Sequence, residues 1–269
     1  EGIRPQELDR TGQLMLKMDD EIKKKTHNED FLSAQATLGY QMAVARAIAD
    51  AQGIEFYQFI SEVAPDLKRQ GFPRDKYVIT SGGRHGAGLD VQEFMVLPGA
   101  PTVAEANRMS DNVDTQQGLI YKALGLQADP NDQGEGQFRG PEGGYIVPNL
   151  TKNKLVEIYL NARHYQTDPV LRNLDLNKLK QENVGIHEFI LHATVAAIEN
   201  AGYKANTSGE VGTVGLALDT AASEMWDKET EKYNYEGRHI TTEEWTGILI
   251  GWAKKFPINE LVKRELIKK

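Results

Sequence analysis

Apolar residues in the first quarter of the chain recur at helical spacing. A polar, helix-compatible stretch at 6–28 comes first, and an alanine-rich stretch at 31–52 follows it and ends before Gly53. Glycine is a typical helix stop, so we predict one helix over 31–52 and a second, short helix over 55–63. The apolar positions that define the predicted face of the longer helix are Leu38, Met42, Ala45 and Ala49.

Short, continuous apolar runs begin at Tyr77 and alternate with helical patterns. Runs bounded by Gly, Pro or Asp predict buried strands at 77–80, 94–97 and 214–218. Between them we predict a loop over 125–149 and a polar, irregular segment after 163. Alternating strands and helices are typical of an α/β fold with a parallel sheet, either open or closed into a barrel. The helices we predict in this part cover 102–124, 150–163, 186–201 and 242–255.

Composition narrows the class of protein. The 269 residues are 40% hydrophobic and 26% charged, which is a soluble globular profile, and the formal net charge is −8. An acidic chain without a basic patch argues against nucleic-acid binding, and no apolar stretch is long enough to span a membrane. The absence of cysteine excludes disulfides, thiolate metal sites and cysteine nucleophiles. We therefore expect a cytoplasmic protein.

Three carboxylates share one sequence context, next to a predicted apolar strand. Glu93 precedes one strand, Glu142 lies in the loop GPEGGYIVPN, and Asp219 ends the strand VGLALD. An acid at the end of a buried strand is costly without a cation or a hydrogen-bond donor, and Mg²⁺ prefers such oxygen ligands. Asp219 could instead cap the helix that follows it. His85, in the glycine-dense loop SGGRHGAG, could be a simple hydrogen-bonding loop residue rather than a functional one.

The segment HEFILH at 187–192 suggests zinc at first sight. Its two histidines are five residues apart, however, which turns them away from each other around a helix. We therefore do not predict a zinc site there.

Taken together, five segments resemble the enolase family, in the family's order along the chain. They include an alanine-rich helix that ends in glycine, a glycine–histidine loop before a Q-E-F-M strand, and an L-D-x-A-A-S-E segment. The five are LSAQATLGYQMAVARAIADAQGIEFYQFI (32–60), SGGRHGAGLDVQEFMVLPGAPT (81–102), EGGYIVPN (142–149), LALDTAASEMWDKETEKYNYEG (216–237) and RHITTEEWTGILIGWAKKFPI (238–258).

The resemblance covers roughly residues 8–258 and implies a fold. We expect a partial enolase-type β/α barrel over 69–269, preceded at 1–68 by helices of the enolase N-terminal domain. Residues 150–185 look like an extra segment, because they are longer and more polar than the family requires. The tail at 259–269 reads as helix rather than as the next barrel strand.

The resemblance also implies a reaction. Enolases dehydrate 2-phosphoglycerate to phosphoenolpyruvate in glycolysis, using Mg²⁺ to stabilise an enolate. Carried over to this chain, Glu142 would be the general acid and Glu93 would support it and touch the substrate. His85 would contact the substrate from a mobile loop, and Asp219 would be a Mg²⁺ ligand.

Several family features have no counterpart in the matched segments. The opening β-rich region, two further metal carboxylates, the base lysine and the phosphate-binding arginine are all missing, and Pro141 replaces an acidic residue. We therefore expect that the isolated chain binds Mg²⁺ weakly or not at all and does not dehydrate 2-phosphoglycerate. A second polypeptide that completes the barrel, or an enolase-like dimer partner, is the expected partner.

Three interpretations stay open at this point. The chain is one half of a split lyase, a catalytically inactive enolase-like scaffolding subunit of a larger assembly, or a fragment of an ordinary enolase. The first residue, Glu1, is not a methionine, which fits a processed product or a fragment. The joint presence of His85, Glu93, Glu142 and Asp219 favours the enzymatic interpretation.

Overall fold

The structure is a computed structural model of the 269-residue chain. It describes residues 12, 13, 17, 21, 24, 34–64, 74–83, 89–126, 139–140 and 142–262. His85, Pro141 and the tail after 262 lie outside these ranges. The chain divides into two compact units, residues 1–73 and 74–269. Their assignment as an enolase-like N-terminal domain and barrel domain stays a prediction.

The first unit contains α2 (Ala34–Gln52) and α3 (Phe56–Val63), close to the predicted helices. Its small core joins the C-terminal turns of α2 to α3 through Ala45, Ile48, Ala49 and Phe59. The prediction of the apolar face of α2 is right for its C-terminal half and wrong for its N-terminal half, where the apolar side chains are exposed. The reason is length: α3 has eight residues and covers only the last turns of α2. The exposed members are Leu38, at 57%, and Met42, at 39%.

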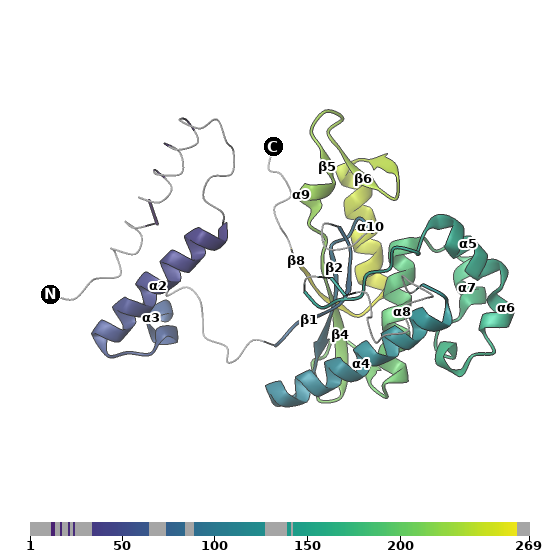
Figure 1. The fold of residues 1–269 in the computed structure, drawn as a ribbon, viewed down its shortest axis with the longest axis horizontal. Coiled ribbons are helices and arrows are strands. Elements are labelled where there is room, and N and C mark those ends of the chain that lie inside the picture. The colour runs from purple at the N-terminus through teal and green to yellow at the C-terminus, as the bar shows by residue number, and fades with distance from the viewer. Residues whose placement is uncertain are drawn as a thin grey trace. The chain divides into compact units, whose positions relative to one another are not determined.

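The second unit is built on a mixed sheet with strand order β1-β2-β4-β3, in which β8 also pairs with β4 (Figure 1). The fold is therefore α/β, as predicted. The expected parallel sheet is wrong for the first strands, because β1–β2 and β2–β4 are antiparallel, whereas β4 is parallel to β3 and β8. The strands are β1 (Tyr77–Ser81), β2 (Glu93–Pro98), β3 (Lys204–Ala205), β4 (Thr213–Asp219) and β8 (Ile258–Val262).

The connections explain the strand directions. Only residues 82–92 separate β1 from β2, and a connection that short favours antiparallel neighbours. Two long helices, α4 (Val103–Ala123) and α8 (Ile186–Asn200), lie between β2 and β4, so the chain returns to the end of the sheet at which β2 finished. Strand β8 replaces the helix that we predicted from residue 259. That prediction is wrong as far as Val262, because the segment pairs with β4 in parallel.

The two faces of the sheet have different neighbours. Side chains alternate between faces along a strand. Phe94 and Val96 of β2 and Leu216 of β4 belong to the main core, which they share with α4 and α8. Met95 of β2 and Ala217 of β4 form a separate small cluster on the opposite face. Helix α4 begins as predicted at Thr102, although the carboxylate of Glu105 pairs with Arg108 and does not complete a capping box.

The segment between β2 and α8 contains a helical insert. We define it as α5 (Lys152–Leu160), α6 (Ala162–Tyr165), the 3-10 turn η2 (Pro169–Leu171) and α7 (Leu176–Gln181). The expected irregular stretch after 163 is therefore partly helical. Its leucines are the cause, because they are buried despite their polar neighbours; they are Leu171, Leu174, Leu176 and Leu179.

A second, three-stranded sheet follows β4 and was not predicted. The short helix α9 (Ala222–Met225) leads into β5 (Trp226–Asp227), β6 (Lys232–Tyr235) and β7 (Arg238–Ile240), and α10 (Thr242–Lys255) comes next, as expected. Tyr235 of this sheet packs against Trp245 and Trp252 of α10. No helix within the described ranges combines the length and apolar character needed to cross a membrane.

Candidate active site

A row of polar side chains crosses the sheet at the edge where β4 ends. Ser81 on β1 is the register partner of Glu93 on β2, and Glu93 is the partner of Asp219 on β4. Directly paired residues point to the same side of a sheet, so all three side chains share one face. They are buried, with exposed fractions of 0%, 8% and 6%. The row therefore withdraws two carboxylates from water.

Strand direction explains why Glu93 and Asp219 meet. In the sequence, Glu93 precedes one apolar strand and Asp219 ends another. Glu93 is the first residue of β2, and it reaches the same edge as Asp219 because β2 runs antiparallel to β4. The antiparallel pairing of β2 with β4 is therefore what brings the two acids together.

The loop that carries Glu142 is docked onto β1 by backbone hydrogen bonds. The Tyr145 N–H donates to the Ile79 carbonyl at 2.8 Å, and the Ser81 N–H donates to the Tyr145 carbonyl at 2.8 Å. Gly144 allows this approach, because a Cβ there would lie 2.5 Å from Ser81 Oγ. The docking brings Glu142 to the polar row, where its carboxyl group hydrogen-bonds with that of Glu93.

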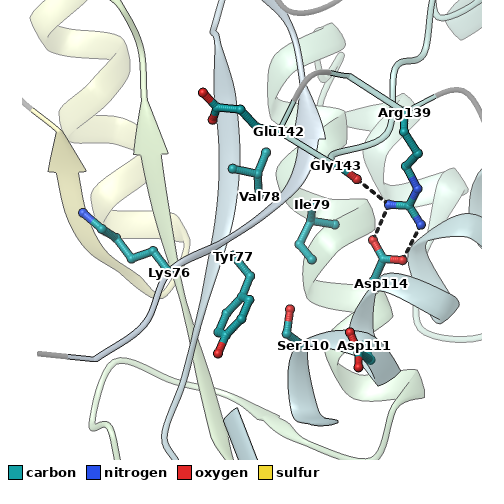
Figure 2. Close-up of a pocket in the computed structure, with 10 residues that line it drawn as sticks. All are labelled: Lys76, Tyr77, Val78, Ile79, Ser110, Asp111, Asp114, Arg139, Glu142 and Gly143. Carbon is teal, nitrogen blue, oxygen red and sulfur yellow. Dashed lines mark hydrogen bonds and ion pairs between the residues drawn. The ribbon is translucent and has the colours of Figure 1, made fainter. Parts of the chain in front are cut away.

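An ion pair holds the same loop to α4. Arg139 donates to both carboxylate oxygens of Asp114, at 2.6 and 2.5 Å, and also donates to the Gly143 carbonyl at 2.8 Å (Figure 2). Its guanidinium lies 3.7 Å from the centre of the Tyr145 ring. Bidentate arginine–carboxylate pairs are among the more strongly oriented polar contacts. Glu142 lines the neighbouring 490 Å³ pocket, so the ion pair fixes one wall of an accessible space.

The protonation of Glu93 is unusual. Burial raises the pKa of Glu93 from its ordinary value of 4.5 to about 7, and the hydrogen bond with Glu142 and the charges of Glu142 and Asp219 act in the same direction. A hydrogen bond with Gln92 opposes the increase. Carboxylates that crowd one another favour holding a proton between them. Glu93 can therefore carry a proton near neutral pH.

Ser81 is a site residue that the sequence did not reveal. Its hydroxyl group is fully buried and has no hydrogen-bond partner among the described residues. Buried hydroxyl groups nearly always have a partner, so an unsatisfied one beside two carboxylates is an exception that needs a reason. No local pattern in TSGG distinguishes Ser81; its register opposite Glu93 does.

Asp219 takes part in a local turn as well as in the row. Its Oδ1 accepts a hydrogen bond from the Ala221 N–H at 2.9 Å, within a turn where Ala221 has a positive φ of 41°. This bond is close to the capping role that we considered as the alternative. Because a carboxylate has two oxygens, the turn leaves coordination capacity at the site.

His85 lies outside the described residues, so its predicted contact with the substrate stays a prediction. The base of its loop is described. The Gly82 N–H donates to the Gln92 carbonyl and the Gly83 N–H to the Leu89 carbonyl, each at 2.7 Å. The loop therefore leaves and rejoins the sheet next to Glu93.

The donor chemistry at the edge fits Mg²⁺ in part. Mg²⁺ takes oxygen ligands and commonly uses one or two protein carboxylates with water and substrate. Asp219 meets that requirement as a single ligand. No group of three or more His, Asp or Glu side chains within the described ranges is arranged to hold a metal ion.

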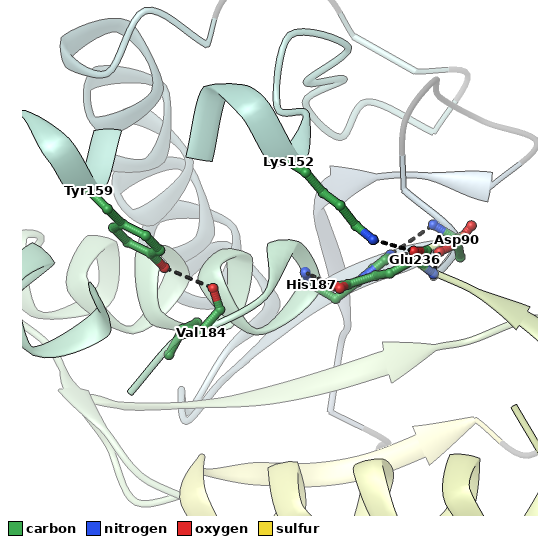
Figure 3. Close-up of polar contacts among 6 residues, drawn as sticks. All are labelled: Asp90, Lys152, Tyr159, Val184, His187 and Glu236. Atoms are coloured by element: carbon green, nitrogen blue, oxygen red, sulfur yellow. Dashed lines mark hydrogen bonds and ion pairs between the residues drawn. The ribbon is translucent and has the colours of Figure 1, made fainter. Parts of the chain in front are cut away.

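A second buried polar cluster lies apart from this edge. His187 at the start of α8 is 1% exposed; its Nδ1 lies 3.0 Å from Glu236 Oε1, and its Nε2 accepts the Asp90 N–H at 2.8 Å (Figure 3). His192 packs instead against Phe256. The two histidines of HEFILH therefore have separate structural surroundings.

The second unit thus combines a mixed α/β sheet with buried carboxylates at one end of its strands. Residues 181–263 match the family model described as the enolase C-terminal TIM barrel domain. The match makes residues 181–263, less than a third of the chain, similar to that enolase domain. The matched range contains Asp219 and β8, so the tail that we considered unmatched belongs to the match as far as residue 263.

Proposed function

We propose that this chain carries the acid side of an enolase-type active site, which acts on 2-phosphoglycerate or a close analogue. The observation that supports this best is the meeting of Glu93, Glu142 and Asp219 at one sheet edge, with Glu93 able to keep a proton near neutral pH. A general acid must hold its proton at the working pH and release it in the transition state.

Each acid has a distinct role in the proposal. The dehydration breaks the C3–O bond, and Glu142 would give a proton to the departing hydroxyl group so that it leaves as water. Glu93 shares a hydrogen bond with Glu142 and would supply or retain that proton. His85 would contact the substrate from the loop that starts and ends beside Glu93. The unsatisfied Ser81 hydroxyl group would donate a hydrogen bond inside the same site.

Asp219 would hold one Mg²⁺ ion together with ligands from elsewhere. Bound Mg²⁺ would offset the negative charge that develops on the substrate carboxylate as the α-proton leaves. The base, the other metal carboxylates and the phosphate-binding arginine would come from polypeptide outside the described residues, in this chain or in a second one. A partner that completes the barrel accordingly remains part of the proposal.

The test is an assay on the purified chain and on any assembly that co-purifies with it, with Mg²⁺ and 2-phosphoglycerate. We expect no turnover at ordinary enolase rates by the chain alone. In an active assembly, Glu142→Gln should lower kcat by about 10²-fold or more, because a general acid contributes on that scale. The matched control is Glu157→Gln on α5, an exposed acid whose partner is Lys154.

Two results would contradict the proposal. One is an assembly with full activity in which Glu142→Gln behaves like Glu157→Gln. The other is a stoichiometric assembly that binds neither 2-phosphoglycerate nor Mg²⁺.

The second result would favour a structural subunit without catalysis. One observation fits that alternative: the helical insert presents Val156 and Leu160 to solvent, 55% and 70% exposed. Exposed apolar side chains on an inserted element suit contact with another protein.

A further inference from the structure

A second pocket lies between the helical insert and the three-stranded sheet. We call it the insert pocket and define it by Lys152, Val156 and Tyr159 of α5, Tyr235 and Arg238 of the sheet, and Trp252 of α10. The start of α8, from Val184 to Ile186, also lines it. Its volume is 530 Å³, within the range of small-molecule sites. The proposed lyase reaction uses none of these residues.

The body of the insert pocket is apolar and aromatic. Tyr159, Tyr235 and Trp252 are 8%, 5% and 3% exposed, so their rings belong to rigid packing and present only a small part to the pocket. The Tyr159 hydroxyl group is satisfied by the Val184 carbonyl at 3.1 Å (Figure 3). Val156, 55% exposed, adds an aliphatic surface. Such walls suit an aromatic or branched aliphatic group.

The two acidic side chains of the insert pocket, Glu188 and Glu236, already interact with other groups of the protein. Glu188 lies 3.9 Å from His192 Nε2 and 2.7 Å from Lys255 Nζ, and these two neighbours lower the pKa of its carboxyl group to about 2. Burial would raise the pKa of Glu236, but the hydrogen bonds with His187 bring it below its ordinary value. Both carboxylates therefore interact with cationic or hydrogen-bonding groups of the protein itself.

The two cationic side chains of the pocket, Arg238 and Lys152, use fewer of their hydrogen-bond donors within the protein. Arg238 has no ion pair among the described residues, and its guanidinium has five N–H donors. Lys152 donates to the Glu236 carbonyl at 2.5 Å, which accounts for one of the three N–H donors of an ammonium group (Figure 3). Lys152 and Arg238 are therefore the two groups of the lining that can pair with a negatively charged group of a ligand.

The pocket wall is fixed before any ligand arrives. The Glu236 N–H donates to Asp90 Oδ2 at 2.7 Å, and His187 joins Asp90 to the Glu236 carboxylate, as Figure 3 shows. Gly185 has no side chain to separate Glu236 from α8, since a Cβ there would lie 2.9 Å from Oε1. These contacts tie the β6–β7 turn to the start of α8. Ligand binding therefore needs to order few further groups of the protein, which lowers its entropic cost.

From this combination we propose that the insert pocket binds a small amphipathic carboxylate, with an aryl group against Tyr159, Tyr235 and Trp252 and its carboxylate between Lys152 and Arg238. The site is separate from the sheet edge that carries Glu93, Glu142 and Asp219, so the proposal does not depend on the lyase function.

The probe is 3-phenylpropionate, titrated into the full chain and followed by backbone amide shifts in two-dimensional NMR. For a ligand of this size we expect a dissociation constant on the order of 1 mM. The neutral analogue 3-phenylpropanamide should bind about 5- to 10-fold more weakly, because it cannot pair with the two cations. The largest shifts should occur at Gly185, Ile186 and Arg238.

Matched variants locate the site. Val156→Glu places a negative charge in the lining and should weaken 3-phenylpropionate binding about tenfold. Leu160→Glu makes the same change on the same helix at an exposed residue that does not line the pocket, and should leave binding unchanged. Arg238→Gln should abolish the preference for the carboxylate over the amide, whereas Arg163→Gln on α6 should preserve it. All four substituted residues are exposed, so a polar side chain at these positions should not disturb folding.

Three outcomes would overturn the proposal. They are equal affinity for the acid and the amide, shifts centred on the sheet edge or spread over the surface, and equal effects of Val156→Glu and Leu160→Glu. Loss of turnover in an assembly with intact binding here would leave this site standing and would count only against the lyase proposal.

Discussion

Two acidic clusters in the second unit differ in the partners of their carboxyl groups. At the sheet edge, Glu93 faces Glu142 and Asp219, and burial with these neighbours raises the pKa of Glu93 to about 7. Beside the insert, Glu236 has His187 as its partner and a pKa below the ordinary value.

The difference teaches how to separate a structural cluster from a functional one. The Glu236 cluster satisfies its own charge and holds elements together. The Glu93 cluster crowds acids and leaves the Ser81 hydroxyl group unsatisfied, so it is stabilised by adding a proton or a cation. Carboxyl groups with a strongly shifted pKa, such as Glu93, are more common at active sites than elsewhere in proteins.

The largest expected change in stability concerns the cluster of His187 and Glu236. His187→Ala removes the partner of the Glu236 carboxylate and leaves a cavity among buried groups, so the free energy of unfolding should fall by about 3 kcal/mol or more. Urea unfolding at neutral pH measures this. His164→Ala, at an exposed position on α6, should change stability by less than about 0.5 kcal/mol. Equal losses of stability for the two variants would show that His187 does not stabilise the Glu236 cluster.

The next effect concerns pH and the sheet edge. Because the pKa of Glu93 is raised from 4.5 to about 7, the folded chain binds more protons than the unfolded chain between those values. Stability should therefore decrease as pH rises through this window, by roughly 1–3 kcal/mol. Glu93→Gln cannot ionise, so it should be as stable as the wild type at pH 5 and more stable at pH 8. Thermal unfolding at both pH values tests this, and a wild-type curve that rises through the window would refute it.

A smaller effect concerns the Arg139–Asp114 pair. Both side chains are partly exposed, 30% and 23%, so solvent weakens the pair. A double-mutant cycle with Arg139→Gln and Asp114→Asn should give a coupling energy of about 1 kcal/mol. Amide hydrogen exchange at Gly143 and Tyr145 should become faster in either single variant. Unchanged exchange would mean that the backbone bonds to β1 hold the Glu142 loop without the ion pair.

The smallest effect concerns Ser81. Removing a buried hydroxyl group that has no partner costs little and can stabilise, so Ser81→Ala should change the free energy of unfolding by about −0.5 to +0.5 kcal/mol. Thr80→Val, one residue earlier, removes a buried hydroxyl group that is bonded to Tyr121 at 2.8 Å and should destabilise by about 1 kcal/mol. A larger loss for Ser81→Ala would show that its hydroxyl group is already satisfied.

Local patterns in the sequence predicted β1, β2, β4 and the long helices, and they singled out Glu93, Glu142 and Asp219. They failed where a contact joins residues distant in sequence. Asp90 meets His187 across 97 residues and Glu236 across 146, and no periodicity marks such a partner. The antiparallel course of β2 and the register that places Ser81 beside Glu93 likewise depend on the whole sheet. The insert was misread because its leucines are buried within a polar stretch.

The pairing of β2 with β4 also bears on the order of folding. The insert joins helices that are close neighbours in sequence, whereas the carboxylate edge exists only after β2 has met a strand synthesised much later. Non-local pairings of this kind form slowly, because a long loop must close first. We expect the acids to come together late in folding. Until then, each remains hydrated and titrates as an ordinary carboxyl group.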